Sequence, residues 1–240
     1  MIQYERQQNI LQLLKKKKTA TVRELAAAVY ASEASVRRDI ETLEKQGLVQ
    51  RIYGGVMLSR FKNSVVPLQF RDSDHSAAKE LIAERAASLV FDGATLILDA
   101  SSTARRMLHY LNHRHDLKII TNNLQLFNEI GNCDAQLYCT GGTYIRENHA
   151  FTGALAESFI RKVSADFLFF SSQGISEDGE ITDASEEETS LRRAMMSRAE
   201  HTYFLCDASK IGQRRLFTLC HKEELTGILC DAPLPWEENP

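Results

Sequence analysis

The sequence predicts an α/β protein in two parts, a small N-terminal domain of three helices and a hairpin, then a larger domain built on a mostly parallel sheet. Three observations lead to this fold class. The length of 240 residues suits a small domain plus a medium one. Residues 1–60 carry 11 basic and 6 acidic side chains, a net charge of +5, whereas the rest of the chain carries 18 and 26, a net charge of −8. Apolar strand-like runs alternate with amphipathic helical segments in the second part only.

The composition excludes several classes of protein. With 43% hydrophobic and 25% charged residues, the chain is typical of neither a disordered nor a fibrous protein. No apolar run approaches the roughly 18 residues of a transmembrane helix, and the first residues lack the apolar core of a secretion signal. The five cysteines include no C-x-x-C pair, which favours reduced thiols. We therefore expect a cytoplasmic protein with no membrane partner.

Three short helices are predicted within residues 1–58, the expected first domain. The first has an apolar face that includes Ile10 and Leu14. The second opens with Thr21-Val-Arg-Glu24, a capping box in which hydroxyl and carboxylate satisfy each other's free backbone N–H groups. The third can be capped by Ser32. Its apolar residues recur at helical spacing and are Val36, Ile40 and Leu43.

Two apolar runs around Gly54-Gly55 predict a tight β-hairpin after the third helix. Three helices followed by a hairpin form a winged helix-turn-helix, whose third helix enters the major groove of DNA. Arginine can donate two hydrogen bonds to guanine, and serine can bond a base edge or a phosphate. The side chains expected to contact double-stranded DNA are Ser32, Ser35, Arg37, Arg38, Arg51 and Tyr53. In the alternative interpretation, Arg37 and Arg38 form a solvated face and pair with Asp39 and Glu41 along the helix.

Residues 59–75 are polar, include Pro67 and show no clear period, so we expect a linker there and a second domain over residues 76–240. Helices and strands alternate in this second domain, which is typical of a parallel sheet covered by helices on both faces. Strands are expected at 94–99, 117–121, 136–140, 167–171 and 203–206. Helices are expected around 79–89, 103–111, 124–130, 154–163 and 187–199.

Polar clusters follow four of these strands, where ligands of parallel sheets bind. Residues 99–103 also open a helix, whose free N–H groups can hold an anion such as phosphate. Glycine allows close backbone approach to a ligand, and lysine can neutralise a phosphate. The candidate ligand contacts are Asp99, Ser101, Ser102, Thr103, Thr121, Asn122, Asn123, Gly141, Gly142 and Lys210. In the alternative interpretation, each cluster consists of ordinary helix caps and turn residues.

Residues 32–39, Ser-Glu-Ala-Ser-Val-Arg-Arg-Asp, and the later Arg51 with Gly54-Gly55 resemble the N-terminal signature of the DeoR family of bacterial sugar-metabolism repressors. The strand-end clusters are similar to the C-terminal part of the same family. The resemblance implies a sensor domain with the fold of ribose-phosphate isomerases and a phosphorylated sugar or polyol as effector. Two positions depart from the family's pattern: Ser101 stands where relatives commonly carry Gly, and Ser176 stands where Asp is frequent.

The sequence therefore predicts a DNA-binding transcriptional regulator, specifically a repressor of a sugar or polyol operon that a phosphorylated sugar releases from operator DNA. We expect a homo-oligomer, either a dimer or a tetramer, because one winged helix reads too few base pairs. No catalytic residue, cofactor or metal is expected, since His109 and His113 have a zinc-like spacing but no carboxylate or cysteine at a matching offset. Two alternatives stay open, an activator and a sugar-phosphate isomerase-like enzyme with an accessory DNA-binding domain.

Overall fold

The computed structural model describes residues 2–59, 68–131 and 133–236. The chain divides into two compact units, Met1–Phe70 and Arg71–Pro240. The boundary between them lies inside helix α4 (Leu68–Ser73). Within the described ranges, every helix is too short or too polar to cross a lipid bilayer.

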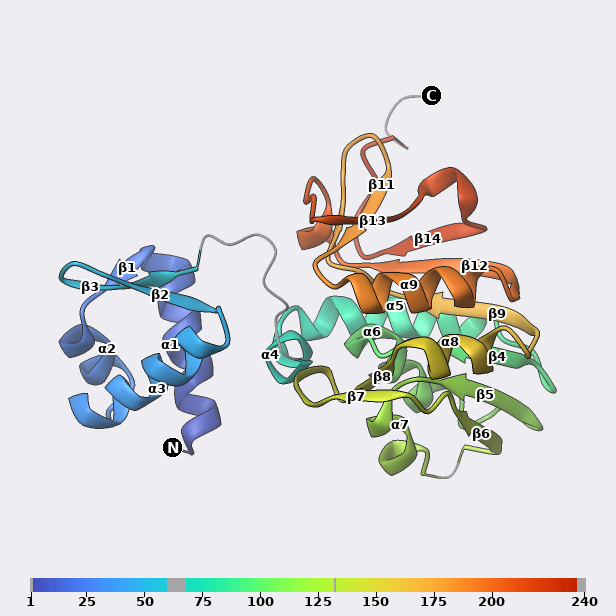
Figure 1. The fold of residues 1–240 in the computed structure, drawn as a ribbon, viewed down its shortest axis with the longest axis horizontal. Coiled ribbons are helices and arrows are strands. Elements are labelled where there is room, and N and C mark those ends of the chain that lie inside the picture. The colour runs from blue at the N-terminus through green and yellow to red at the C-terminus, as the bar shows by residue number, and fades with distance from the viewer. Residues whose placement is uncertain (1, 60–67, 132, 237–240) are drawn as a thin grey trace. The chain divides into compact units, whose positions relative to one another are not determined.

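Three helices and a small antiparallel sheet form the first unit, as the sequence predicts (Figure 1). The elements are α1 (Gln3–Lys17), β1 (Thr19–Ala20), α2 (Val22–Ala28), α3 (Glu33–Lys45), β2 (Val49–Ile52) and β3 (Gly55–Leu58). The strand order is β1-β3-β2, and β2 with β3 forms the predicted hairpin. Its turn needs Gly54, whose φ of 83° lies in the left-handed region. Strand β1 was not predicted, because two residues are too few to show a period.

The apolar faces of the three helices meet in one core, and local caps fix where α2 and α3 begin. The predicted capping box is present, since Thr21 accepts a hydrogen bond from the N–H of Glu24 (3.1 Å) and Glu24 accepts one from the N–H of Thr21 (2.8 Å). Ser32 caps α3 in the same way through the N–H of Ser35 (3.2 Å). The fully buried core residues include Ile10, Leu14, Leu25, Val36, Ile40 and Leu43.

The second unit is built on a six-stranded parallel sheet, which confirms the predicted fold class. Its order is β14-β12-β9-β4-β5-β6, and every neighbouring pair is parallel. The strands are β4 (Thr95–Leu98), β5 (Leu117–Thr121), β6 (Ala135–Cys139), β9 (Ala165–Phe170), β12 (Ala199–Cys206) and β14 (Gly227–Cys230). A hairpin of β7 (Thr143–Ile145) and β8 (Ala150–Thr152) lies outside this sheet, as does an antiparallel sheet of β10 (Gly174–Ile175), β11 (Glu180–Asp183) and β13 (Phe217–His221).

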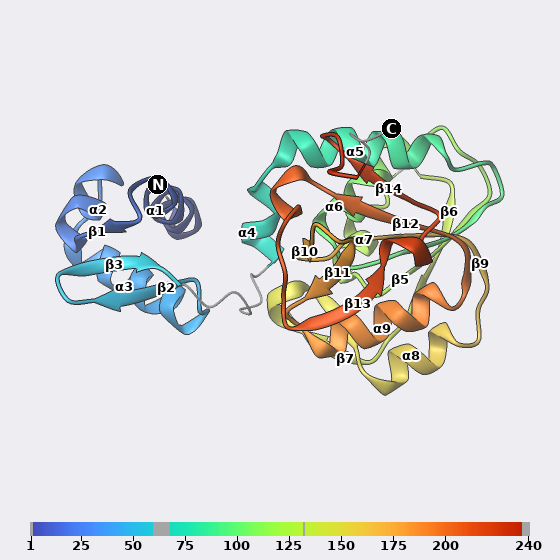
Figure 2. The same cartoon turned by 90° about the horizontal axis from the view of Figure 1, so that it is seen from above.

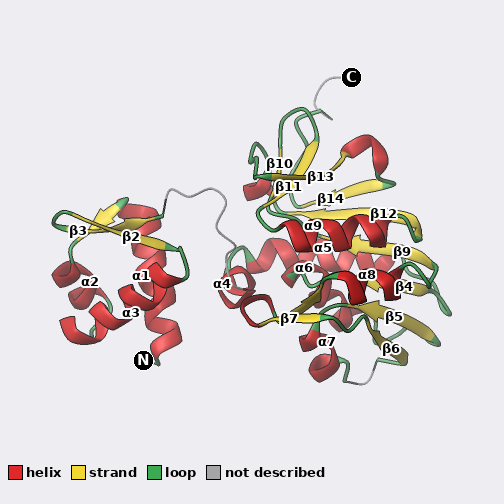
Figure 3. Cartoon of the chain, viewed as in Figure 1, coloured by secondary structure: helices red, strands yellow, loops and turns green. Residues whose placement is uncertain are grey.

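Helices cover both faces of the parallel sheet (Figures 2 and 3). One face carries α5 (Ser76–Ser88), α6 (Ser102–Arg106), the short η1 (Met107–Tyr110) and α7 (Leu124–Glu129). The other carries α8 (Ala154–Ile160), α9 (Glu186–Met196) and the antiparallel sheet. Short 3-10 turns η2 (Arg146–Asn148), η3 (Ala208–Lys210) and η4 (Lys222–Glu224) complete the chain.

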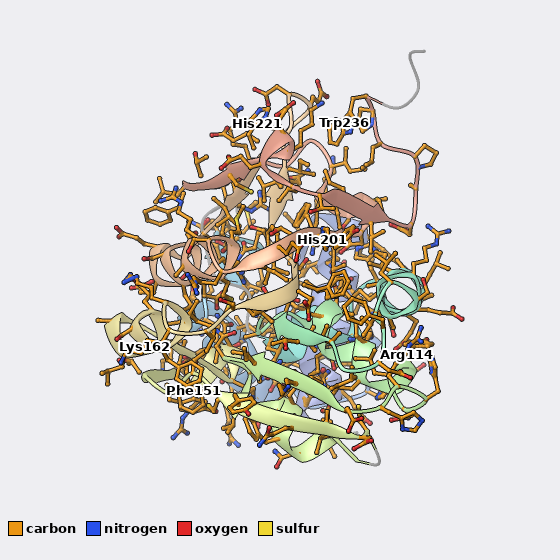
Figure 4. The ribbon with its side chains drawn as sticks, turned by 90° about the vertical axis from the view of Figure 1, so that its right-hand side faces the viewer. Arg114, Phe151, Lys162, His201, His221 and Trp236 are labelled. Atoms are coloured by element: carbon orange, nitrogen blue, oxygen red, sulfur yellow. The ribbon has the colours of Figure 1, made fainter. Side chains whose placement is uncertain are left out.

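Successive residues of a strand point to opposite faces of the sheet and so enter the two hydrophobic cores in turn. On β4, Leu96 and Leu98 enter the core under α5, whereas Ile97 enters the core under α9. The central strands β4 and β9 are mostly buried on both faces and are therefore almost continuously apolar. His201 lies on β12 (Figure 4). Its ring packs against Phe167 of β9, with 5.5 Å between their centroids.

The strand order reverses beside β4, and this position determines where a ligand can bind. From β4, the strands β5 and β6 follow in order toward one edge of the sheet. The later strands β9, β12 and β14 follow in order toward the other edge. After β4 the chain enters α6 on one face, and after β9 it enters β10 and the antiparallel sheet on the other. A crevice at the carboxyl ends of β4 and β9 is therefore expected to be the ligand site.

The structure differs from the sequence predictions in a few elements. Helix α4 lies within the segment 59–75 that the sequence predicts as a linker, and residues from Arg71 onward belong to the second unit. The part of that segment at 60–67 lies outside the described residues. The β7–β8 hairpin and the antiparallel sheet were missed because most of their strands have only two to four residues, too few to show an alternating pattern.

Candidate functional site

Helix α3 presents a polar face next to its buried one. Arg37 and Arg38 are both exposed, and Ser32 and Ser35 lie at the helix start with 3.0 Å between their hydroxyl oxygens. Arg37 forms an exposed ion pair with Glu33, one turn earlier (3.4 Å). Among the described residues, the guanidinium of Arg38 has no ion-pair or hydrogen-bond partner. Arg38 is thus free to donate to a base or a phosphate.

Asp39 does not pair with either arginine, so the alternative interpretation of this helix is wrong on that point. Its carboxylate is fully buried and accepts hydrogen bonds from Arg6 (2.5 Å to Nε) and Gln7 (3.2 Å) of α1. Glu41 pairs instead with Lys45 (3.0 Å). Asp39 therefore fixes α3 against α1 and leaves the outer face of α3 to the arginines.

A groove of about 550 Å³ runs between α2, α3 and the hairpin. Arg37, Arg38 and Arg51 line it together, as does Arg23 of α2, which the sequence analysis missed. Arg51 is held by Glu44 of α3 (3.1 Å), which orients the hairpin arginine beside the helix. The four arginines outnumber the two acidic side chains that line the same groove, so its charge suits a polyanion.

The remaining predicted DNA contacts lie beside this groove. Ser32 and Ser35 are at the start of α3, and Tyr53 is fully exposed at the tip of the hairpin. Their contribution to DNA binding stays a prediction.

A small pocket lies in the second unit where the strand order reverses. It is lined by Arg71, Lys79, Ser101, Ser102, Ser171, Ser172, Gln173, Asp183, Arg192 and Lys210. These residues come from α4, α5, the start of α6, the loops after β4 and β9, β11, α9 and η3. The cavity measures about 40 Å³, whereas sites for small organic ligands span roughly 300–1,000 Å³. A ligand larger than a few water molecules can enter only if some of these side chains move.

A buried ion network adjoins this pocket, whose lining includes two of its members, Asp183 and Arg192. Arg192 donates to Asp99 (2.9 Å), Asp183 (3.0 Å) and Glu188 (2.9 Å), and all four side chains are buried. Burial lowers the pKa of the Arg192 guanidinium, but the three carboxylates outweigh it and raise that pKa overall. Asp99 also accepts the N–H groups of Ser101 (3.1 Å) and Ser171 (3.3 Å), so it ties the loops after β4 and β9 together beneath the pocket.

Two lysines and an arginine supply positive charge at the pocket. Lys210 donates to the hydroxyl of Ser171 (2.6 Å) and lies 3.5 Å from Asp207. Lys79 is almost fully buried, and its ammonium donates to the backbone carbonyls of Asp74 (2.7 Å) and Arg71. Burial, assisted by the charge of Lys210, lowers the pKa of Lys79 to about 8. The pocket therefore holds its cations close together, as an anion site requires.

Four more of the predicted ligand contacts, Thr103, Thr121, Asn122 and Asn123, lie outside the lining of this pocket, and the last three have structural partners. Thr121 donates to the carbonyl of Leu98 (2.7 Å), and Asn123 caps α7. Asn122 donates to the carbonyl of Phe151 (3.0 Å). Thr103, within α6, is buried. A ligand role for these residues stays a prediction.

The two adjacent glycines after β6 have different surroundings. Both have positive φ, but a Cβ on Gly142 would lie only 2.5 Å from the carbonyl oxygen of Thr152, whereas a Cβ on Gly141 would meet nothing within 4 Å. Gly142 thus permits close packing against β8 and α8, and its role as a ligand contact stays a prediction.

Comparison with known proteins identifies both units. A family model described as "DeoR-like helix-turn-helix domain" matches residues 6–60, and one described as "DeoR C terminal sensor domain" matches residues 74–232. The chain belongs to the DeoR family. This DeoR family member is a transcriptional regulator, with a DNA-binding unit followed by a sensor unit.

Relatives of this DeoR family member match over nearly their full length. The "L-fucose operon activator" of Haemophilus influenzae is 32% identical over 96% of this chain and 92% of its own. The "Lactose phosphotransferase system repressor" of Staphylococcus aureus is 30% identical over 96% of this chain and 93% of its own. Among solved structures, the tetrameric eIF2B-beta2-delta2 complex from C. thermophilum is similar in fold, with 13% identity, a TM-score of 0.50, and coverage of 92% of this chain and 67% of that one.

Several pocket residues of this DeoR protein were not predicted as ligand contacts. Arg71 and Arg192 do not follow a predicted strand, so nothing in their spacing placed them at the ends of β4 and β9. Ser171 and Ser172 follow β9 directly, so the rule that ligands bind after strands could have found them. Ser101, at a departure from the family pattern, accepts the N–H of Ala104 (3.1 Å) and caps α6.

Proposed function

We propose that this regulator is a repressor of a sugar or polyol operon and that a phosphorylated sugar releases it from operator DNA. Two of its relatives bear names that refer to sugars, L-fucose and lactose, and both names refer to control of gene expression. One is called an activator and the other a repressor, so the sign of regulation is part of the proposal. Because a transcriptional regulator must reach its operator DNA, we place the protein in the cytoplasm as part of this proposal.

The observation that carries the proposal is the group of cations at the strand ends. Arg71, Lys79 and Lys210 converge on one pocket together with the hydroxyls of Ser101 and Ser171. Ammonium and guanidinium groups with nearby hydroxyl donors are the usual ligands of a phosphate group. Residues 61–240 carry 18 basic and 26 acidic side chains, so the overall charge of this part repels an anion. The local cations must therefore supply its affinity.

We propose in addition that the pocket binds its effector without converting it and that two or four copies act together on DNA. The Arg38 face of a single α3 spans too few base pairs for an operator, and paired half-sites multiply the affinity. Asp183, which lines the pocket, and the buried Asp99 are both engaged by Arg192 and therefore poorly placed to act as bases.

A melting screen tests the effector class. The full-length protein is heated with pentose, hexose and polyol phosphates and with the matching unphosphorylated sugars. Each compound that raises the melting temperature is then added to a gel-shift assay with the DNA upstream of the protein's own gene. We expect at least one phosphorylated compound to raise the melting temperature and weaken DNA binding, while its unphosphorylated form does neither.

The same samples test the alternatives. If no phosphorylated compound changes both properties, the proposed effector class is wrong. Conversion of a sugar phosphate into its isomer in the mixture would favour the enzyme alternative. An effector that strengthens DNA binding would favour an activator.

A further inference from the structure

Helix α4 is held by groups that border the effector pocket. Asp72 of α4 forms ion pairs with Arg105 (2.7 Å) and Arg106 (2.5 Å), the last two residues of α6. Arg106 also donates to the backbone carbonyl of Asp72 (2.8 Å). Burial raises the pKa of Asp72, but the two arginines outweigh it and lower that pKa overall. The carboxylate is therefore ionised when it meets the arginines.

The same α6 begins in the pocket. Ser101 caps α6, Ser102 is its first residue, and both line the cavity. Arg106 lies one turn after Ser102, and its Nη1 donates both to the carbonyl of Ser102 (3.0 Å) and to the carboxylate of Asp72. One guanidinium nitrogen thus bridges a pocket residue and α4. A shift of the loop that holds a ligand would move this nitrogen.

A second contact holds the same end of α4. The ammonium of Lys79 lines the pocket and donates to the carbonyls of Arg71 and Asp74. An anion that recruits Lys79 competes with these carbonyls, and the small cavity already requires lining side chains to move before a sugar phosphate can enter. Ligand binding and the contacts that hold α4 in place therefore depend on the same side chains.

We propose that Asp72 is a positioning residue that couples the pocket to the linker. The boundary between the two units lies inside α4, so the chain reaches the DNA-binding unit through this helix. In the conformation of the chain that binds operator DNA, the ion pairs of Asp72 are intact. The effector favours a conformation in which these ion pairs are broken. This inference rests on the proposed function, in which the effector weakens DNA binding. A ligand can shift the balance only if it binds one arrangement more tightly than the other.

The test also measures effector affinity, which would not rise if Asp72 only stabilised the fold. If breaking the Asp72 ion pairs weakens operator binding, it must also strengthen effector binding, because the two affinities are linked. Asp72→Asn keeps the size of the side chain and removes its charge. We expect operator affinity without effector to fall by about tenfold, effector affinity to rise severalfold, and added effector to have little further influence on DNA binding.

The matched control is Glu129→Gln. Glu129 of α7 is the other ion-pair partner of Arg105, and it does not belong to α4. This variant removes one of the two carboxylates that pair with Arg105 and leaves Asp72 in place. It should therefore respond to effector as the unaltered protein does. Operator affinity is measured by gel shift and effector affinity by calorimetry, with the sugar phosphate that gives the largest melting shift in the screen.

The outcomes separate this inference from the proposed function. If the unaltered protein responds to the sugar phosphate and Asp72→Asn responds equally, the coupling role of Asp72 is refuted and the proposed function stands. If the unaltered protein itself never responds, the proposed function fails and the inference fails with it. Should Asp72→Asn not fold, hydrogen exchange decides: in the unaltered protein, the amides of residues 68–75 must exchange faster with effector bound, and unchanged exchange overturns the coupling.

Discussion

Arg192 donates to Asp99 across 2.9 Å, and both side chains are buried next to the small pocket at the ends of β4 and β9, which Arg192 lines. Asp99 also accepts backbone N–H groups from the loops after β4 and β9, so this ion pair joins a helix on one face of the sheet to the point where the strand order reverses. The charge of Arg192 is shared with Asp183 and Glu188. The network therefore fixes the framework that surrounds the pocket cations.

Arg192→Met is expected to destabilise the second unit by about 3–5 kcal/mol, because it leaves three buried carboxylates without their cation. The free energy of unfolding is measured by urea denaturation. Arg161→Met serves as the control, since Arg161 is exposed and the loss of its ion pair with Glu157 should change stability by less than about 1 kcal/mol. Equal losses in the two variants would contradict the structural role of the Arg192 network.

Gly142→Ala is expected to destabilise the protein by about 2–4 kcal/mol, from a strained φ of 111° and a clash of the new Cβ with the carbonyl of Thr152. Gly141→Ala is the neighbouring control, because its φ of 62° lies in the left-handed region that alanine can adopt at a modest cost and the space around it is open. It should cost about 1 kcal/mol. Thermal unfolding of both variants checks the difference, and a Gly141→Ala loss as large as that of Gly142→Ala would rule out the close packing.

Sequence reasoning predicted the elements whose signals are local. The cap at Ser32, the capping box at Thr21 and the hairpin at Gly54 each involve residues a few positions apart, and the structure has all three. The parallel sheet followed from apolar strands that alternate with helices. Such signals survive in sequence because helix caps and tight turns depend on their own neighbours.

The composition of the pocket could not be predicted in the same way. Arg192 reaches Asp99 across 93 positions of sequence, and Arg71 comes from a segment that looks like a linker. Asp39 looks like an intrahelical partner of the arginines, but its position on the buried face of α3 turns it toward Arg6 and Gln7. These contacts depend on how the elements pack, which periodicity alone does not encode.

Arg38→Ala is expected to weaken operator binding by about 1–3 kcal/mol, because Arg38 is exposed beside the groove and has no partner among the described residues that would compete with DNA. Lys45→Ala is the control on the same helix, since Lys45 lies at its C-terminal end and does not line the groove. Gel shifts with specific and unrelated DNA measure the effect. If the two variants lose affinity equally, Arg38 acts only through general charge and does not read sequence.

Effector affinity is expected to fall as pH rises through about 8. Burial lowers the pKa of Lys79 from its ordinary 10.5 to about 8, so the ammonium is present at pH 7 and is progressively lost above pH 8. A phosphate monoester loses its second proton near pH 6, roughly two units below the pKa of Lys79. The charge of the ligand therefore stays nearly constant as Lys79 titrates. The charged groups that surround Lys79 are Lys210, Asp207, Arg106 and Asp74.

Loss of one charge-assisted hydrogen bond costs about 1.5–3 kcal/mol, so calorimetry should show an affinity at pH 9.5 at least about tenfold below that at pH 7. Lys79→Met should bind more weakly at pH 7 and show a much flatter dependence between these two values, because the group that titrates is gone. If the variant keeps the full slope, a different group is responsible. The pocket would then bind its effector without the charge of Lys79, and the competition between effector and helix α4 for this lysine would lose its basis.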